Sequence, residues 1–123
     1  MATLDSVALK AFVPAKDYKL SKAFYKDIGF TMGADKEGIA YFFHNECSFF
    51  LQDFYEPKHA NNFMMHMLVK DINKWHDFFI SEGISDKYKT KISKVTKQPW
   101  GMYDFTLIDP CGVLWRFGQN IND

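Results

Sequence analysis

The sequence predicts an α+β domain built from two similar βαβββ halves. The first observation behind this prediction is an internal repeat, in which "AKDYKLSKAFYKDIGF" (15–30) matches "VKDINKWHDFFISEGI" (69–84) without gaps. Four pairs of positions are identical: Lys16 and Lys70, Asp17 and Asp71, Phe24 and Phe78, Gly29 and Gly83. The second observation is that strand-like segments precede and follow both copies, so each copy belongs to a larger repeated unit.

Each copy of the repeat has the features of a capped helix. Asp17 and Asp71 are suited to accept hydrogen bonds from the first free N–H groups of a helix. Gly29 and Gly83 are suited to the left-handed conformation that ends one. The expected apolar stripes are Leu20, Ala23, Phe24 and Ile28 in the first helix, and Ile72, Trp75 and Phe79 in the second.

Apolar and alternating segments predict the strands. Before the two helices these are "SVALKAFV" (6–13) and "NFMMHMLV" (62–69). After the first helix come "IAYFFH" (39–44) and "CSFFLQDF" (47–54), and after the second come "YKTKISKV" (88–95), "MYDFTLI" (102–108) and "VLWRFGQ" (113–119). Residues 1–123 thus form a single domain, with modules at about 5–54 and about 62–120 and a linker at about 55–61.

Composition excludes several classes of partner. Fifteen basic and fifteen acidic residues give a formal net charge of zero, which argues against nucleic acid or an anionic membrane as partner. The lysines at 87, 89 and 91 are expected to alternate on one solvated strand face. No signal peptide is recognisable, the apolar runs are too short to span a bilayer, and two Cys make no disulfide framework. A cytoplasmic location is therefore expected.

Three segments of the chain resemble the vicinal oxygen chelate superfamily, also called the glyoxalase/bleomycin resistance/dioxygenase superfamily. They are "AFYKDIGF" (23–30), "HMLVKDINKWHDFF" (66–79) and "PWGMYDFTLIDPCGVLWRFGQ" (99–119), and the last is similar to the closing segment of bleomycin-resistance-type members. The resemblance implies that the paired βαβββ modules form a curved mixed sheet around a cleft. It also implies a homodimer, often with modules paired across chains, and ligand sites at the dimer interface.

Metal-using relatives carry His or Glu on the first and last strands of each module. By this resemblance, the corresponding residues are Lys10, Met64, Arg116 and either Gln52 or Phe50, whose register the sequence leaves open. A lysine ammonium and a guanidinium have no lone pair to offer, and a thioether suits soft metals. No metal ligand and no cofactor are therefore expected, with a divalent metal as the alternative.

Strand periodicity sorts the side chains between the two faces of the sheets, because residues i and i+2 share a face. If the metal positions of relatives face the cleft, one set of residues also does: Ala8, Lys10, Phe12, Met64, His66, Leu68, Leu114 and Arg116. Val113, Trp115 and Phe117 then face the helices.

Arg116 is the only arginine in the chain, and two interpretations of it stay open. A guanidinium can anchor an anionic or carbonyl-bearing ligand through its planar fork. Alternatively, it forms an internal ion pair with an acid such as Glu46 or Asp53, or is simply exposed.

Three other residues also have two interpretations each. His66 is a hydrogen-bonding group of the cleft and the one catalytic candidate, or a histidine satisfied by its neighbours. The resemblance implies that Trp100 lies beside the ligand, where it can stack on a planar ring, and the alternative is packing at the dimer interface. Lys10 does chemistry as a desolvated amine or extends its head group to water.

The main functional hypothesis is a homodimer that binds or sequesters a small molecule without metal. The ligand is expected to be neutral or anionic, with aromatic molecules as one class, and bleomycin itself fits poorly because Lys10 and Arg116 are cationic. The expected binding residues are Arg116, His66, Trp100, Lys10, Met64, Gln52, Phe50 and Phe12. The alternatives are a lyase, isomerase or dioxygenase that uses an atypical metal set with His66 and Gln52, and a partner-binding domain with a filled cleft.

Overall fold

The computed structural model describes residues 3–121, and two four-stranded sheets organise them. The first half contains β1 (Phe12–Ala15), α1 (Tyr18–Asp27), β2 (Thr31–Lys36), β3 (Ile39–His44) and β4 (Cys47–Asp53). The second half contains β5 (Met64–Leu68), α3 (Ile72–Ser81), α4 (Ile84–Tyr88), β6 (Thr96–Gln98), β7 (Met102–Ile108) and β8 (Leu114–Asn120). A short helix, α2 (Pro57–Ala60), lies in the predicted linker.

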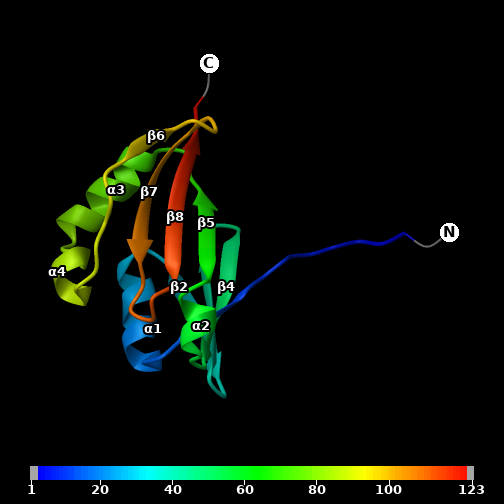
Figure 1. The fold of residues 1–123 in the computed structure, drawn as a ribbon. Coiled ribbons are helices and arrows are strands. Elements are labelled where there is room, and N and C mark those ends of the chain that lie inside the picture. Colours follow the sequence, from blue (N-terminus) through cyan, green and yellow to red (C-terminus); the bar gives the residue numbers. More distant parts are fainter. Residues whose placement is uncertain (1–2, 122–123) are drawn as a thin grey trace.

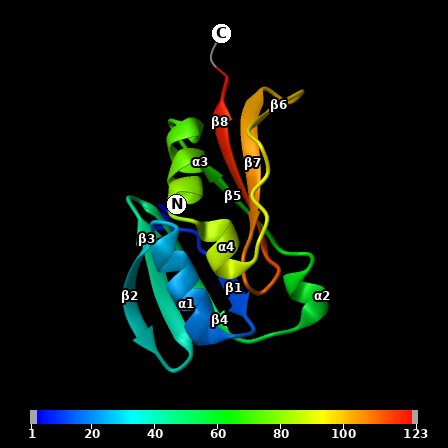
Figure 2. The ribbon, with the colours of Figure 1, turned by 90° about the vertical axis from the view of Figure 1, so that its left-hand side faces the viewer.

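The two sheets have the same topology, β1-β4-β3-β2 and β5-β8-β7-β6. In each, the first strand pairs in parallel with the last, and the other neighbours are antiparallel. Helices α1, α3 and α4 lie on one side of the sheets, and the N-terminal segment leaves on the other (Figure 1). Turned by 90°, the molecule shows the two halves one above the other, each with its sheet and helix (Figure 2). The predicted α+β fold with two βαβββ modules is confirmed.

Both predicted helix caps are present. The Asp17 carboxylate accepts a hydrogen bond from Leu20 N at 3.0 Å, and the Asp71 carboxylate accepts one from Lys74 N at 3.2 Å. Gly29 and Gly83 follow the helices with φ of 113° and 66°, which a residue with a side chain adopts only at a cost.

The predicted apolar stripe of α1 is partly wrong. Phe24 and Ile28 are buried, whereas Leu20 and Ala23 are exposed. The buried face includes Ser21 and Tyr25 instead, because the Tyr25 ring reaches partners in the second half. The predicted stripe of α3 holds better, since Ile72 and Phe79 are buried and Trp75 is half-buried.

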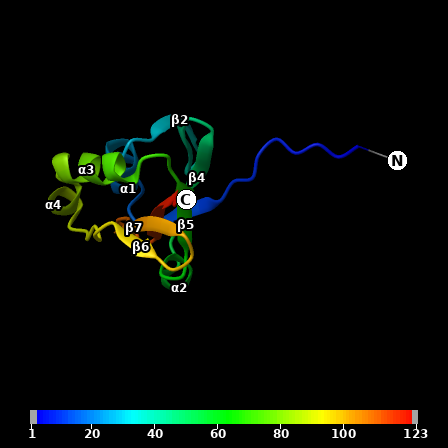
Figure 3. The same cartoon turned by 90° about the horizontal axis from the view of Figure 1, so that it is seen from above.

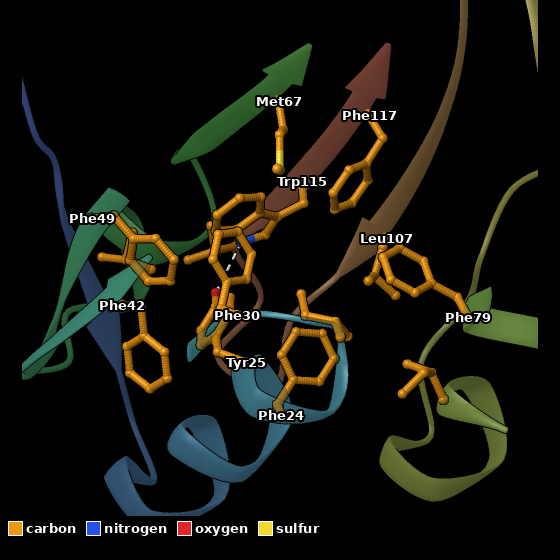
Figure 4. Packing of buried hydrophobic residues seen from close by; sticks show 14 of the residues in the cluster. Phe24, Tyr25, Phe30, Phe42, Phe49, Met67, Phe79, Leu107, Trp115 and Phe117 are labelled. Atoms are coloured by element: carbon orange, nitrogen blue, oxygen red, sulfur yellow. Dashed lines mark hydrogen bonds between the residues drawn. The ribbon is translucent and has the colours of Figure 1, made fainter. Parts of the chain in front are cut away.

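One core joins the two halves. Tyr25 of α1 and Phe49 of β4 pack against Trp115 of β8, with ring centroids 5.5 and 5.3 Å from the indole (Figure 4). Trp115 Nε1 donates a hydrogen bond to Tyr25 Oη at 2.9 Å, and Tyr25 Oη donates one to the buried carboxylate of Asp109. Burial raises the pKa of Asp109 to about 6. The "DPCG" turn is therefore part of the core.

In the first half, one predicted strand begins later than expected and one strand was not predicted. The segment 6–13 was expected to be a strand, but β1 begins only at Phe12. The carbonyl oxygen of Ala11, just before β1, accepts a hydrogen bond from Phe50 N. Residues 3–9 run outward from there, away from the two sheets (Figures 1 and 3). Strand β2 was not predicted, because "TMGADK" is a mostly exposed edge strand with little apolar character.

The predicted strand over 88–95 is also wrong. Helix α4 ends at Tyr88, Lys89 adopts a left-handed φ of 51°, and Ile92 makes a single bridge to Leu107. Lys87 and Tyr88 both hydrogen-bond to Asp27 of α1, at 2.6 and 2.5 Å. These contacts with the first half favour the helix over the strand that the alternating lysines suggested.

Candidate ligand-binding faces

Each sheet has a core face and an open face, and the strand parity of the sequence sorts them correctly where strands form. Val113, Trp115 and Phe117 are buried against the helices. On the opposite side Phe12, Met64 and Leu68 are about half exposed, at 48%, 55% and 53%. Both open faces are therefore accessible in the single chain.

The open face of the first sheet carries a row of aromatic rings, here named the aromatic face: Phe12, Tyr41, Phe43 and Phe50. Phe12 stacks on Phe50 with centroids 5.0 Å apart, Phe50 lies 5.8 Å from Tyr41, and Tyr41 stacks on Phe43 at 5.6 Å. The strand register places Phe12, Phe50 and Tyr41 directly across from one another. A planar ligand can stack on such a surface.

Two more of the predicted site residues lie at the aromatic face. The Lys10 ammonium lies over the Tyr41 ring, 5.9 Å from its centroid. Gln52 is two residues from Phe50 on β4 and so shares its side of the sheet. It is half-buried and lies between Pro14 and Ile39 on the neighbouring strands.

The open face of the second sheet carries polar side chains where the first sheet carries aromatic rings. These residues are named the polar face: Gln98, Asp104, Thr106, His66 and Arg116. His66 lies directly opposite Arg116, and Arg116 lies directly opposite Thr106. The predicted neighbours His66 and Arg116 are thus side by side on β5 and β8.

Arg116 pairs with an acid that the sequence interpretation did not name. Its Nη1 donates to Asp104 Oδ2 at 2.9 Å, and Gln98 Nε2 donates to Asp104 Oδ1 at the same distance. The suggested partners Glu46 and Asp53 are therefore wrong. Asp104 is on the strand adjacent to Arg116 and on the same open face, so its carboxylate lies within reach of the guanidinium.

Gly118 makes room for this arrangement. A Cβ atom at Gly118 would lie 2.9 Å from both His66 Nε2 and Met102 Cε, closer than real contacts allow. The ends of both side chains therefore lie over the backbone of β8 at Gly118, beside Asp104, which is the residue opposite Gly118. Only a glycine permits His66 to lie so close to the strand.

The strand register settles which residue of the first sheet corresponds to Arg116. The repeat maps Phe12 onto His66 (Lys16 onto Lys70, Asp17 onto Asp71). Phe12 lies opposite Phe50, and His66 lies opposite Arg116. Phe50, not Gln52, is therefore the equivalent of Arg116, and the equivalent positions differ sharply in chemistry.

A groove of about 580 Å³ brings residues of the two halves together. It lies between the N-terminal segment, the start of β4 and strand β5, and it includes Lys10, Met64 and His66. The other predicted site residues are not among its lining residues: Arg116, Phe12, Phe50, Gln52 and Trp100. Trp100 lies in the turn between β6 and β7 and is 58% exposed.

Six residues at these faces were missed by the sequence interpretation: Tyr41, Phe43, Gln98, Met102, Asp104 and Thr106. The alternation of "MYDFTLI" puts Asp104 on the same side as Thr106, but nothing local shows that β7 neighbours the strand of Arg116. Tyr41 could have been found by the same parity argument, applied to "IAYFFH".

The donor groups at the metal positions of relatives do not suit a divalent metal. Lys10 and Arg116 offer no lone pair, Phe50 offers no donor atom, and Met64 offers a thioether. Within residues 3–121, no three His, Cys, Asp or Glu side chains are grouped so as to hold a metal ion. Over the same residues, no helix has the length and apolar character needed to cross a membrane.

The model of the Glyoxalase/Bleomycin resistance protein/Dioxygenase superfamily matches residues 3–117. The chain belongs to this superfamily. No curated protein matches the sequence closely enough to count as a relative. The superfamily assignment therefore comes from the family model and agrees with the paired βαβββ modules.

Solved structures of the superfamily share the fold. A bleomycin-binding protein complexed with bleomycin is 22% identical, with a TM-score of 0.81 over 94% of this chain and 99% of that one. A bleomycin-binding protein from Streptomyces verticillus, complexed with copper(II)-bleomycin, is 16% identical, with a TM-score of 0.80 over 98% and 100%. Lactoylglutathione lyase from Agrobacterium tumefaciens is 17% identical, with a TM-score of 0.67 over 94% and 95%.

Proposed function

We propose that the protein is a homodimer that binds a small neutral or anionic molecule, aromatic molecules included, in a cleft between an aromatic face and a polar face, without a bound metal. The observation that carries this proposal is the contrast between the two open faces. Phe12, Phe50 and Tyr41 offer rings for stacking, and His66 and Arg116 offer hydrogen bonds at the equivalent place on the other sheet. Binding sites combine apolar walls with a few polar groups in this way.

The dimer is supported by what the single chain leaves uncovered. Leu4, Val7 and Leu9 of the N-terminal segment are almost fully exposed, and Met64 and Leu68 expose half of their surface on the unpaired edge of β5. Apolar side chains gathered in this way are typical of interaction surfaces. A second copy would cover them and bring one aromatic face opposite one polar face.

Binding without metal is supported by the chemistry of Lys10, Phe50, Met64 and Arg116. The bleomycin-binding proteins with similar folds support small-molecule binding as the general function. The alternative metal set of His66 and Gln52 has less support, because two donors are fewer than the three protein ligands of a typical catalytic zinc site.

The test is a fluorescence titration with N-phenyl-1-naphthylamine, a neutral aromatic probe, combined with light scattering for the mass in solution. We expect a dimer, saturable binding, and an affinity about tenfold weaker in Phe50→Leu, because a ring of the aromatic face is lost. Phe78→Leu is the matched control, since Phe78 is a partly exposed ring on α3. Absence of saturable binding, or equal effects of the two substitutions, would contradict the proposal.

A further inference from the structure

Asp104 is a charged residue of the polar face with an unusual environment. Its side chain is 3% exposed, although it lies on an open face of the sheet, whereas the Arg116 side chain is 28% exposed. Both of its oxygens accept a hydrogen bond, Oδ2 from Arg116 and Oδ1 from Gln98, each at 2.9 Å. A carboxylate held on both sides has a fixed position, and the guanidinium that it holds is fixed with it.

The pair alters the charge that the polar face presents to a ligand. Arg116 alone would offer a full positive charge to an anion, but the carboxylate lies 2.9 Å from its Nη1. The carboxylate offsets much of the attraction of the guanidinium for an anion, because the two opposite charges lie close together. What remains is a set of directed N–H donors.

Those donors point to a particular kind of acceptor. Within residues 3–121 the guanidinium donates one hydrogen bond, from Nη1 to Asp104, so its other N–H groups are left for a ligand. Thr106 and His66 flank it on the two neighbouring strands. A neutral carbonyl or amide oxygen can accept from such donors and needs no net positive charge.

We propose that Asp104 determines the charge specificity of the cleft, by pairing with Arg116 so that the polar face accepts neutral, hydrogen-bond-accepting aromatic ligands in preference to anionic ones. This inference rests on the proposed function, because it concerns the ligand of the same cleft. Lys10, the other cation near the cleft, lies over Tyr41 on the aromatic face and keeps its charge in every Asp104 variant, so these substitutions test the charge of the polar face alone.

The test compares two aromatic probes that differ in charge: neutral N-phenyl-1-naphthylamine and anionic 8-anilinonaphthalene-1-sulfonate. In Asp104→Asn the guanidinium keeps a hydrogen-bonding neighbour but loses its counter-charge. We expect the affinity for the anionic probe to rise about tenfold, as one unit charge at ligand distance predicts, with little change for the neutral probe. In Asp104→Asn/Arg116→Gln this gain should disappear.

Asp77→Asn is the matched control, because it changes the net charge equally at an exposed position of α3. An unchanged ratio of the two affinities in Asp104→Asn, or a gain that persists in the double variant, would overturn the inference. If neither probe binds the natural protein, it is the proposed function that fails.

If Asp104→Asn does not fold, Lys10→Gln provides a test with the Arg116–Asp104 pair intact. Its affinity for the anionic probe should change by about twofold or less between low and high salt, because a neutral pair is little affected by screening. A steep loss of affinity with salt, together with a preference for the anionic probe, would contradict the inference.

Discussion

Asp109 illustrates how a single buried residue connects the closing turn to both halves of the molecule. Its carboxylate accepts hydrogen bonds from the backbone N–H groups of Cys111 and Val113, at 2.9 and 2.8 Å, and one from the Tyr25 hydroxyl. Burial outweighs these hydrogen bonds and raises its pKa from 3.8 to about 6. The folded protein therefore binds this proton more tightly than the unfolded chain does.

The consequence is a pH-dependent term in stability. Protonated Asp109 contributes about 3 kcal/mol to the free energy of unfolding. This contribution is fully present below about pH 4 and is lost as the pH rises through about 6. We expect Asp109→Asn to lack this loss, because an amide does not ionise. Urea unfolding of both proteins between about pH 4 and pH 7 measures it, and parallel stability curves for the two proteins would contradict the assignment.

Gly118 is a second residue whose role is local. In Gly118→Ala the new methyl group would meet His66 Nε2 and Met102 Cε at 2.9 Å, so both flexible side chains must move away. We expect a small change in unfolding free energy, about 1 kcal/mol or less, but weaker binding of N-phenyl-1-naphthylamine.

A double variant shows whether Gly118→Ala weakens binding by displacing His66 or in another way. If Gly118→Ala acts by displacing His66, then adding it to His66→Ala should cost little further affinity. Full additivity of the two losses would show that Gly118 acts in another way.

At the scale of elements, the two repeated helices depend on their capping carboxylates. Asp17→Ala and Asp71→Ala each remove the acceptor for an otherwise free N–H group, at Leu20 and Lys74. We expect each to lower the unfolding free energy by about 1 kcal/mol. Asp77→Ala, within α3, is the control, and chemical denaturation is the measurement; equal effects at all three positions would contradict the capping role.

The elements that the sequence predicted are those with a strong local pattern. The caps at Asp17 and Asp71, the glycines that follow each helix, and the alternation in "VLWRFGQ" are all visible in short segments. Strand β2 was missed because it is a mostly exposed edge strand with little apolar character. Helix α4 was missed because contacts distant in the sequence favour it, such as the pair of Lys87 with Asp27 of α1 at 2.6 Å.

In the candidate site too, features within one strand were predictable and contacts between strands were not. His66 and Arg116 were placed on one face from their alternation within single strands, and the structure puts them side by side. The Arg116–Asp104 pair was not predictable, because it depends on β7 being the neighbour of β8. The equivalence of Phe50 and Arg116 likewise required the register between β1 and β4.

At the scale of the whole molecule, the extended N-terminal segment is the feature that a single chain does not explain. Leu4, Val7 and Leu9 are almost fully exposed, and the segment projects from the body (Figure 3). Exposing three apolar side chains is unfavourable by several kcal/mol in total, at about 1.5–3 kcal/mol each, unless something covers them. A second copy of the chain is the partner that we propose.

We therefore expect deletion of residues 2–9 to weaken the dimer while the body stays folded, because the strands begin only at Phe12. Sedimentation equilibrium measures the dimer dissociation constant, and circular dichroism checks the fold. The double variant Leu4→Ser/Val7→Ser keeps the length of the segment, and it should also raise the dimer dissociation constant. An unchanged dissociation constant in both variants would exclude the segment from the interface.

Small-molecule binding without metal is tested most directly by one titration performed twice. N-phenyl-1-naphthylamine is titrated into protein treated with a chelator and into protein incubated with Ni²⁺, Mn²⁺, Fe²⁺ or Zn²⁺ and then desalted, with metal content measured in each sample. We expect the same dissociation constant in both forms and no metal retained after desalting. About one retained metal ion per site, with binding only in the loaded form, would contradict binding without metal and would favour the metal-dependent enzyme.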